Sequence, residues 1–293
     1  MPTKTYMAIL LAILVLIWGI SWPIMTEGLK YCPPIWFSTL RLIIAVSVVF
    51  AVFGALGQLS LPSKRDLPLI FSIGFFQIGV FEMLITLGLG YVEPGRSAII
   101  AYLAPFFVTP VAVMFFGEEL SLGKIAGLLL GGAGIALLFS PWQLNWHDKH
   151  ILLGNGLLVL SSVVWGAVML HTRYATWHRA THVLLPWQLL MSVIPNLVMA
   201  FILVPHMVIE WHAPMFLFSL LYNALLSSLV AYWLVITITR HLPVITMSLA
   251  LLAVPVLGLL ASAATLGEQL TPSIIMSLVL IVVGLACVSV AKD

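Results

Sequence analysis

Long apolar stretches alternate with short polar breaks along the whole chain. A helix that crosses the hydrocarbon layer needs about 20 mostly apolar residues. Stretches of roughly this length cover residues 6–27, 34–56, 67–90, 95–116, 122–140, 153–175, 182–204, 214–238, 243–265 and 271–290. The breaks between them, such as 31–34 and 61–66, contain the Pro, Gly and charged residues that are typical of turns. The pattern predicts an all-α integral membrane protein with ten transmembrane helices.

The positive residues indicate how these helices are oriented. Lysine and arginine are retained on the cytoplasmic side of membrane proteins. Eight of them lie at the helix ends on the side of the N-terminus: Lys4, Lys64, Arg65, Lys124, Arg173, Arg179, Arg240 and Lys292. The opposite side holds Lys30, Arg96 and Lys149. We therefore expect both termini in the cytoplasm, which an even number of helices allows.

Composition excludes several classes of function. Hydrophobic residues make up 62% of the chain and charged residues 8%, against about 25% charged residues in soluble domains, so lipid must cover much of the surface. The net charge of +2, with no basic cluster beyond Lys64 and Arg65, argues against nucleic-acid binding. Cys32 and Cys287 form no metal-binding pattern. No catalytic residue set or phosphate loop is recognisable, so we expect no enzyme, no metal and no cofactor.

The chain contains an internal repeat. Identical residues recur at an offset of 150: Pro105 and Pro255, Gly117-Glu118 and Gly267-Glu268, Leu120 and Leu270, and Gly134 and Gly284. An offset of 147 aligns Trp18-Gly19 with Trp165-Gly166. We therefore expect two five-helix halves, 1–140 and 153–293. Because five is odd, the second half is inverted, and two inverted halves can open one central site alternately to each side.

The repeated motifs resemble the EamA family of the drug/metabolite transporter superfamily. The resemblance is carried by the small-residue stretch 95–106 with its Pro, the Gly-Glu turn within 116–121, and their second copies in 248–256 and 266–270. The Trp-Gly opening of the first helix, 18–22, also matches. Gln269 departs from the first copy, which has Glu119. The resemblance implies a multi-pass carrier in a bacterial inner membrane that exports amino acids or other small metabolites from a cavity between the halves.

We therefore expect a secondary transporter that works by alternating access, with proton coupling left open. The expected partners are the lipid bilayer, a small-molecule substrate and protons, and a monomer and a homodimer both remain open. Efflux of several drugs or lipophilic cations is the closest alternative. A solute channel is the alternative from a different class.

Glu82 is the first candidate site residue, because it lies in the middle of the third predicted helix. A charge at mid-bilayer costs about 2.5–3.5 kcal/mol on insertion scales, so Glu82 should face a wet cavity or be protonated. It could contact a substrate amine or couple protons, or simply bond to a neighbouring helix. Tyr232 occupies the repeat-related position, 150 residues later, and is a second candidate. Its alternative is a packed tyrosine bonded to backbone.

Four further candidates and two hinges complete the predicted site. Arg41 could meet a substrate carboxylate, although a structural role is favoured, in which it snorkels toward the outer interface or pairs with another helix. His171 could join a proton relay or serve as a helix-end histidine. Trp18 and Trp165 are deep and repeat-related, and could touch substrate, whereas Trp22, Trp36, Trp177 and Trp187 fit an interfacial belt. Pro105 and Pro255 should bend their helices near mid-membrane and could act as hinges.

Overall fold

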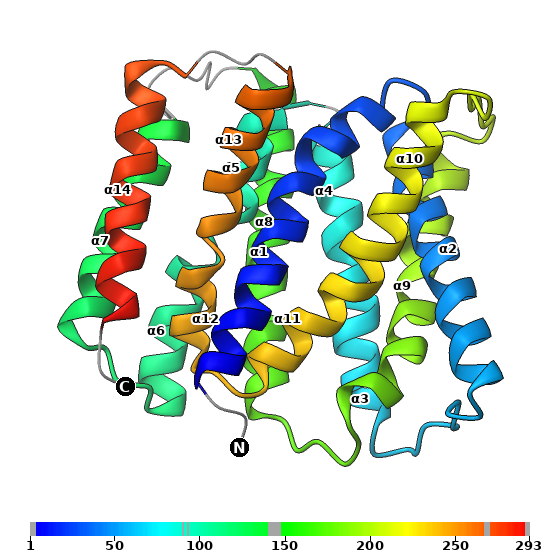
Figure 1. Cartoon of the computed structure of the whole chain (residues 1–293), viewed down its shortest axis with the longest axis horizontal. Helices are drawn as coiled ribbons and strands as arrows, with labels where there is room; N and C mark the ends of the chain where they lie inside the picture. The colour runs from blue at the N-terminus through cyan, green and yellow to red at the C-terminus, as the bar shows by residue number, and fades with distance from the viewer. Residues whose placement is uncertain (1–3, 90, 93, 140–147, 267–269, 291–293) are drawn as a thin grey trace.

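The computed structural model describes residues 4–89, 91–92, 94–139, 148–266 and 270–290. These residues form an all-helical bundle (Figure 1). The first half contains α1 (Lys4–Gly28), α2 (Pro34–Ala55), α3 (Leu67–Leu69), η1 (Ile70–Val80), α4 (Phe81–Leu89), α5 (Pro94–Ala101), α6 (Ala104–Phe116) and α7 (Leu122–Phe139). The second half contains α8 (Lys149–Tyr174), α9 (Thr181–Leu203), α10 (Pro214–Tyr222), η3 (Asn223–Val230), α11 (Ala231–Thr239), α12 (Val244–Ala250), α13 (Ala253–Leu266) and α14 (Pro272–Ser289).

These elements combine into ten crossings of the bundle. In the described part of the chain, eight continuous or nearly continuous helices are long and apolar enough to span a membrane. Two shorter apolar helices, Leu122–Leu137 and Pro272–Val288, make the other crossings. The predicted all-α membrane fold with two halves is therefore present. The first helix begins and the last ends at the same, lower end of Figure 1.

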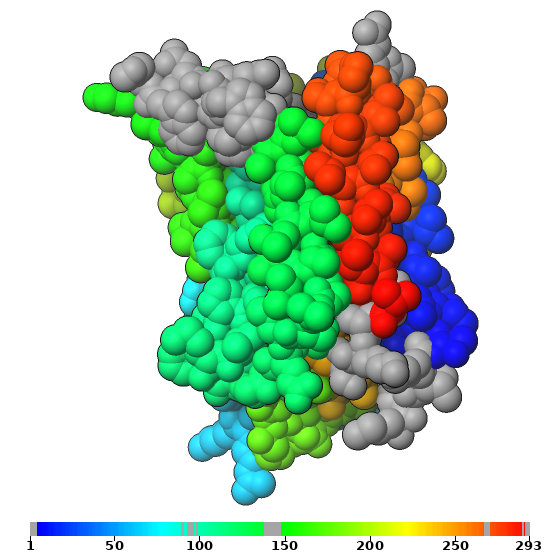
Figure 2. Space-filling view, turned by 90° about the vertical axis from the view of Figure 1, so that its left-hand side faces the viewer, coloured from blue at the N-terminus to red at the C-terminus, as the bar shows by residue number. Residues whose placement is uncertain are grey.

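Helices of one half pack against helices of the other. The main contacts pair η1 and α2 with α9, α4 with α8, α6 with α12, and α1 with α10, α11 and α13. The pair α7 and α14 forms one edge of the bundle (Figures 1 and 2). Glycine allows its close approach, because a Cβ on Gly127 would lie 2.3 Å from Cγ2 of Val288.

The fourth and ninth crossings are broken rather than bent. The stretches 95–116 and 243–265 were each predicted as one helix, but α5 ends at Ala101 before α6 begins, and α12 ends at Ala250 before α13 begins. Each break comes just before the proline of the repeat. Pro105 lies in the first turn of α6, where a missing N–H group removes no helical bond. At the other end of α6, Gly117 stops the helix in the left-handed conformation, with φ of 66°.

The third and eighth crossings both contain π-helix. The segments η1 and η3 begin within their spans and end at Val80 and Val230, which are 150 residues apart. π-helical turns are rare in proteins, and those that occur are often found at functional sites. Nothing in the sequence predicted them. They directly precede Phe81-Glu82 and Ala231-Tyr232, and therefore set how these positions face the interior.

Candidate functional site

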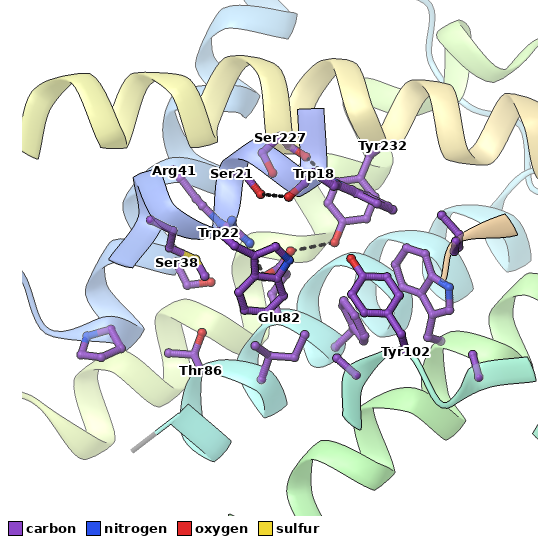
Figure 3. Close-up of a pocket in the computed structure, with 18 of the residues that line it drawn as sticks. Trp18, Ser21, Trp22, Ser38, Arg41, Glu82, Thr86, Tyr102, Ser227 and Tyr232 are labelled. Atoms are coloured by element: carbon purple, nitrogen blue, oxygen red, sulfur yellow. Dashed lines mark hydrogen bonds and ion pairs between the residues drawn. The ribbon is translucent and has the colours of Figure 1, made fainter. Parts of the chain in front are cut away.

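A pocket lies between the two halves at the centre of the bundle (Figure 3). The first half contributes side chains from α1, α2, α4, the α5–α6 break and α6. The second half contributes Trp165 from α8, Ser227 from η3, Tyr232 from α11 and Ser248 from α12. The lining extends to Leu29 and Pro34, where α1 ends and α2 begins. The pocket thus reaches from mid-bundle toward the end opposite the start of α1.

Two opposite charges and a tyrosine meet in this pocket. The guanidinium of Arg41 on α2 forms an ion pair with Glu82 on α4. The hydroxyl of Tyr232 on α11 donates a hydrogen bond to Oε1 of Glu82 at 2.8 Å. Arg41 is 5% and Tyr232 1% exposed. Arg41 therefore does not snorkel toward the interface. It pairs α2 with α4, in agreement with the helix-pairing interpretation, because a carboxylate from another helix neutralises its charge inside the bundle.

The two repeat-related positions touch each other. Glu82 and Tyr232 are 150 residues apart, and they lie where the inverted halves meet. The alternative of a Tyr232 hydroxyl bonded to backbone does not hold, because the carboxylate of Glu82 accepts its hydrogen bond. Glu82 also does more than bond to one neighbouring helix, since Arg41 and Tyr232 reach it from different halves.

Arg41 and Glu82 can still form hydrogen bonds to a ligand. The side chain of Glu82 is 15% exposed, and its oxygens can accept more hydrogen bonds than the structure shows. Nε of Arg41 is buried and has no hydrogen-bond partner among the described residues. Both charges therefore have unused polar capacity beside the cavity.

Aromatic rings surround the charged group. The rings of Trp18 and Trp165 pack edge to face with centroids 5.6 Å apart, and Trp18 packs against Tyr232 at 5.8 Å. The indole N–H of Trp18 donates to the backbone oxygen of Ser227 at 3.1 Å, which fixes the ring. Trp22 also lines the pocket, and its place in an interfacial belt stays a prediction. The site thus combines two charges with broad apolar walls.

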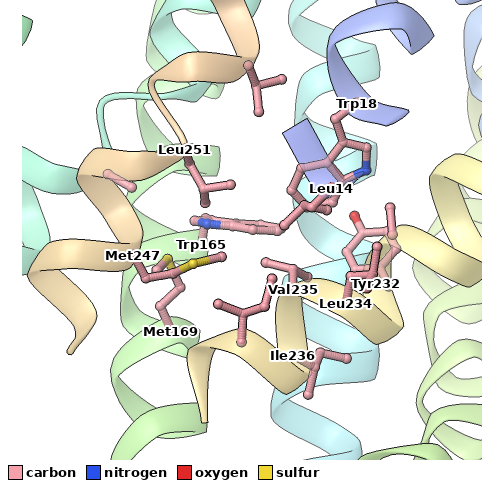
Figure 4. Close-up of a cluster of buried hydrophobic side chains, with 14 of the residues drawn as sticks. Leu14, Trp18, Trp165, Met169, Tyr232, Leu234, Val235, Ile236, Met247 and Leu251 are labelled. Atoms are coloured by element: carbon pink, nitrogen blue, oxygen red, sulfur yellow. The ribbon is translucent and has the colours of Figure 1, made fainter. Parts of the chain in front are cut away.

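A plug of apolar side chains closes the pocket toward the end where α1 begins. Beyond Trp18 and Trp165 lie Leu14, Met169, Val235 and Met247, all completely buried (Figure 4). Close packing of this kind leaves no room for a solute. The pocket is therefore closed at one end and extends toward the other.

The remaining candidates, His171, Pro105 and Pro255, differ in whether they line the pocket. His171 does not line the pocket, and its Nδ1 lies 2.7 Å from Oγ of Ser72 on η1. The structure therefore does not bring it together with Glu82. Pro105 lines the pocket, whereas Pro255 is buried in α13 outside its lining.

Several lining residues escaped the sequence prediction, including Ser21, Ser38, Thr86, Tyr102 and Ser227. Tyr102 could have been found, because it is a polar residue just before the repeat proline at the expected break. The small hydroxyl residues carried no signal. Ser and Thr are common in membrane helices, where they bond to their own backbone.

Outside the membrane-spanning segments, Asp66 is a buried carboxylate held by hydrogen bonds and by a nearby positive charge. It is completely buried before α3 and accepts hydrogen bonds from the backbone N–H and the hydroxyl of Ser63, at 2.8 and 2.7 Å. Arg179, from the loop before α9, lies 3.4 Å away. Burial alone would raise the pKa of Asp66, but the hydrogen bonds and the nearby positive charges outweigh it and lower the pKa. This contact fastens the 56–66 loop to the second half.

Ten crossings in two halves, with a charged pocket closed at one end between them, define a membrane transporter of small molecules. Comparisons with known proteins agree. The profile of the EamA-like transporter family matches residues 5–140 and 152–290, one copy in each half. The chain belongs to this family, as its motifs predicted. It is a transporter and not an enzyme.

Individual relatives extend this finding. The chain is 30% identical to the uncharacterized transporter YoaV of Bacillus subtilis over 271 residues, which is 92% of each chain. It is 25% identical to a probable amino-acid metabolite efflux pump of Escherichia coli over 287 residues, 94% of this chain and 92% of that one. A solved crystal structure, 18% identical, superposes with a TM-score of 0.79 and covers 97% of this chain and 96% of that one. This last likeness supports the fold alone.

Proposed function

We propose that the protein is a secondary carrier that exports amino acids or related small metabolites by alternating access. The observation that carries the proposal is the Arg41–Glu82–Tyr232 group in the pocket. An α-amino acid carries one positive and one negative charge. Glu82 would receive its ammonium group and Arg41 its carboxylate, so the internal ion pair would be exchanged for two ion pairs with the substrate.

Such an exchange suits a carrier, because binding must be reversible. Each charge leaves one partner and gains another, so substrate binding leaves no uncompensated charge in a medium of low dielectric constant. The aromatic walls formed by Trp18 and Trp165 would hold the substrate side chain. The name of the 25% identical relative from Escherichia coli supports amino-acid metabolites as the cargo.

We further propose that transport is coupled to protons through Glu82. A proton on Glu82 would release Arg41 and compete with a substrate ammonium group. His171 is no longer part of this proposal, because it lies outside the pocket. Pro105 and Pro255 remain proposed hinges, since each helix break lies beside one of them.

The proposed location is a bacterial inner membrane with both termini in the cytoplasm. The distribution of eight positive residues against three supports this orientation. The apolar plug would then close the cytoplasmic end. One chain contains both halves, so a monomer could transport, and a homodimer is equally compatible.

The test is flux into liposomes that contain the purified protein. A panel of labelled amino acids and aromatic cations is offered with and without an imposed pH gradient. Saturable amino-acid flux that responds to the gradient and disappears in Glu82→Gln is the expected result. Flux of many lipophilic cations without amino-acid flux would replace the proposal by multidrug efflux, and conductance far above carrier turnover would indicate a channel.

A further inference from the structure

The turn after α6 makes a contact that its sequence position does not suggest. Glu118 lies in the turn between α6 and α7, where a carboxylate could meet the start of the helix that follows it. The structure instead directs it across to the second half. Its Oε1 accepts a hydrogen bond from the backbone N–H of Val244 at 2.6 Å, and its Oε2 accepts one from Ile245 at 3.0 Å. Glu268, its repeat counterpart, lies outside the described residues.

A third hydrogen bond strengthens this contact. The hydroxyl of Tyr174, at the end of α8, donates to Oε1 of Glu118 at 2.6 Å. The ring of Tyr174 stacks on Phe116 of α6, with centroids 4.0 Å apart and planes 8° apart. One carboxylate of the first half thus joins two helices of the second. Hydrogen bonds to a charged acceptor are roughly twice as strong as neutral ones.

The helix that Glu118 holds is short and reaches the pocket. α12 contains only the seven residues Val244–Ala250. Ser248 lines the pocket, and Met247 is part of the apolar plug. Val244 and Ser248 are one helical turn apart, about 6 Å along the axis. A displacement of α12 at Glu118 would therefore move the plug and the pocket wall together.

The other end of α12 is a break. Leu251 and Leu252 interrupt the crossing before α13 begins, two residues ahead of Pro255. The preceding residue Pro243 provides no side-chain cap to α12. The first backbone N–H groups of α12 therefore depend on Glu118, a residue of the opposite half, for their hydrogen bonds.

We propose that Glu118 is a positioning residue of the transport cycle, which holds α12 in place while the pocket is closed at this end. Release of the three hydrogen bonds lets α12 swing about the Leu251–Leu252 break, withdraws Met247 from the plug and opens the route. Substrate passes between the halves beside α12. This inference rests on the alternating access proposed above, but not on the identity of the substrate.

The first test measures access to the plug. Met247→Cys, in a protein whose two native cysteines are replaced by Ser, is treated with a charged thiol reagent. We expect Glu118→Ala to raise the labelling rate about tenfold or more, since one hydrogen bond to a charged group corresponds to at least such a change in an equilibrium. Tyr174→Phe should give a smaller increase. Glu119→Ala, which removes the same charge from an exposed neighbour, should leave the rate unchanged.

Equal labelling rates in Glu118→Ala and Glu119→Ala would overturn the inference. Tyr174→Phe keeps the carboxylate of Glu118 and covers the case in which Glu118→Ala folds poorly. A second test asks whether α12 must move away from residue 118 during transport. Glu118→Cys and Val244→Cys are joined by a short, reducible thiol crosslinker, and flux in liposomes is measured before and after reduction. Flux that stops on crosslinking and returns on reduction is expected, whereas flux through the crosslinked protein contradicts the proposal. If the protein without these substitutions transports no member of the panel, the proposed cargo is wrong. The labelling test then still shows whether Glu118 holds α12 in place.

Discussion

The ion pair between Arg41 and Glu82 allows a quantitative test by a double-mutant cycle. Removing one member of a buried pair leaves an uncompensated charge, which costs about 3–5 kcal/mol. Glu82→Gln should approach the upper part of this range, because it isolates Arg41, whose side chain is 6% exposed. Arg41→Met should cost less, since the remaining carboxylate keeps the hydrogen bond from Tyr232 and its side chain is more exposed, at 15%.

The double variant Arg41→Met with Glu82→Gln leaves no charge behind. Replacing a buried pair by uncharged groups is often close to neutral, so we expect the double variant to be more stable than Glu82→Gln alone. The coupling energy should be about 2–3 kcal/mol. Unfolding in mixed detergent micelles, followed by near-UV circular dichroism, gives the four stabilities. Strictly additive single effects, with coupling below about 0.5 kcal/mol, would refute the reasoning.

Transport in the same variants separates stability from function. The double variant should remain folded but carry no amino acid, because neither charge is left to receive the substrate. If the stable double variant transported at the original rate, the proposed role of the pair in recognition would be wrong, whatever the stability cycle showed.

Three further predictions concern single positions. Tyr232→Phe should lower stability by about 1.5–3 kcal/mol, measured in the same micelles, because Glu82 loses a hydrogen bond to a charged group. Gly74→Ala should cost about 1–3 kcal/mol, since its Cβ would lie 2.4 Å from a backbone oxygen of α9; Gly54→Ala, with open space around it, should be neutral or stabilising. The lowered pKa of Asp66 means that its stabilisation is fully present above the ordinary value of 3.8 and is lost as the pH falls through the folded-state pKa. Asp66→Asn should therefore flatten the dependence of the unfolding midpoint on pH below 3.8. An unchanged dependence in this pH range would contradict the prediction.

The sequence was sufficient for the fold but only partly for the pocket. Hydropathy and the 150-residue offset predicted ten crossings and identified Tyr232 as the position equivalent to Glu82, because apolar length and repeat symmetry are properties of the chain itself. The partner of Glu82 was not predictable, since Arg41 lies 41 residues earlier and only the packing of α2 against α4 brings them together. The π-helical segments and the reach of Glu118 to α12 also depend on tertiary contacts, and short-range patterns carry no information about them.

The two halves share a backbone plan but not their charges. Both have a break before a proline and a π-helical segment, so the same bending points are available at either end of the bundle. The charges of the pocket come from the first half alone, because Tyr232 stands opposite Glu82, and the positions equivalent to Arg41 at offsets of 147 and 150 are Gln188 and Met191. A symmetric pair of charged groups would offer a zwitterion two opposite orientations. With one Arg and one Glu, the proposed substrate binds in a single orientation, and the symmetric scaffold can open to either side without turning it.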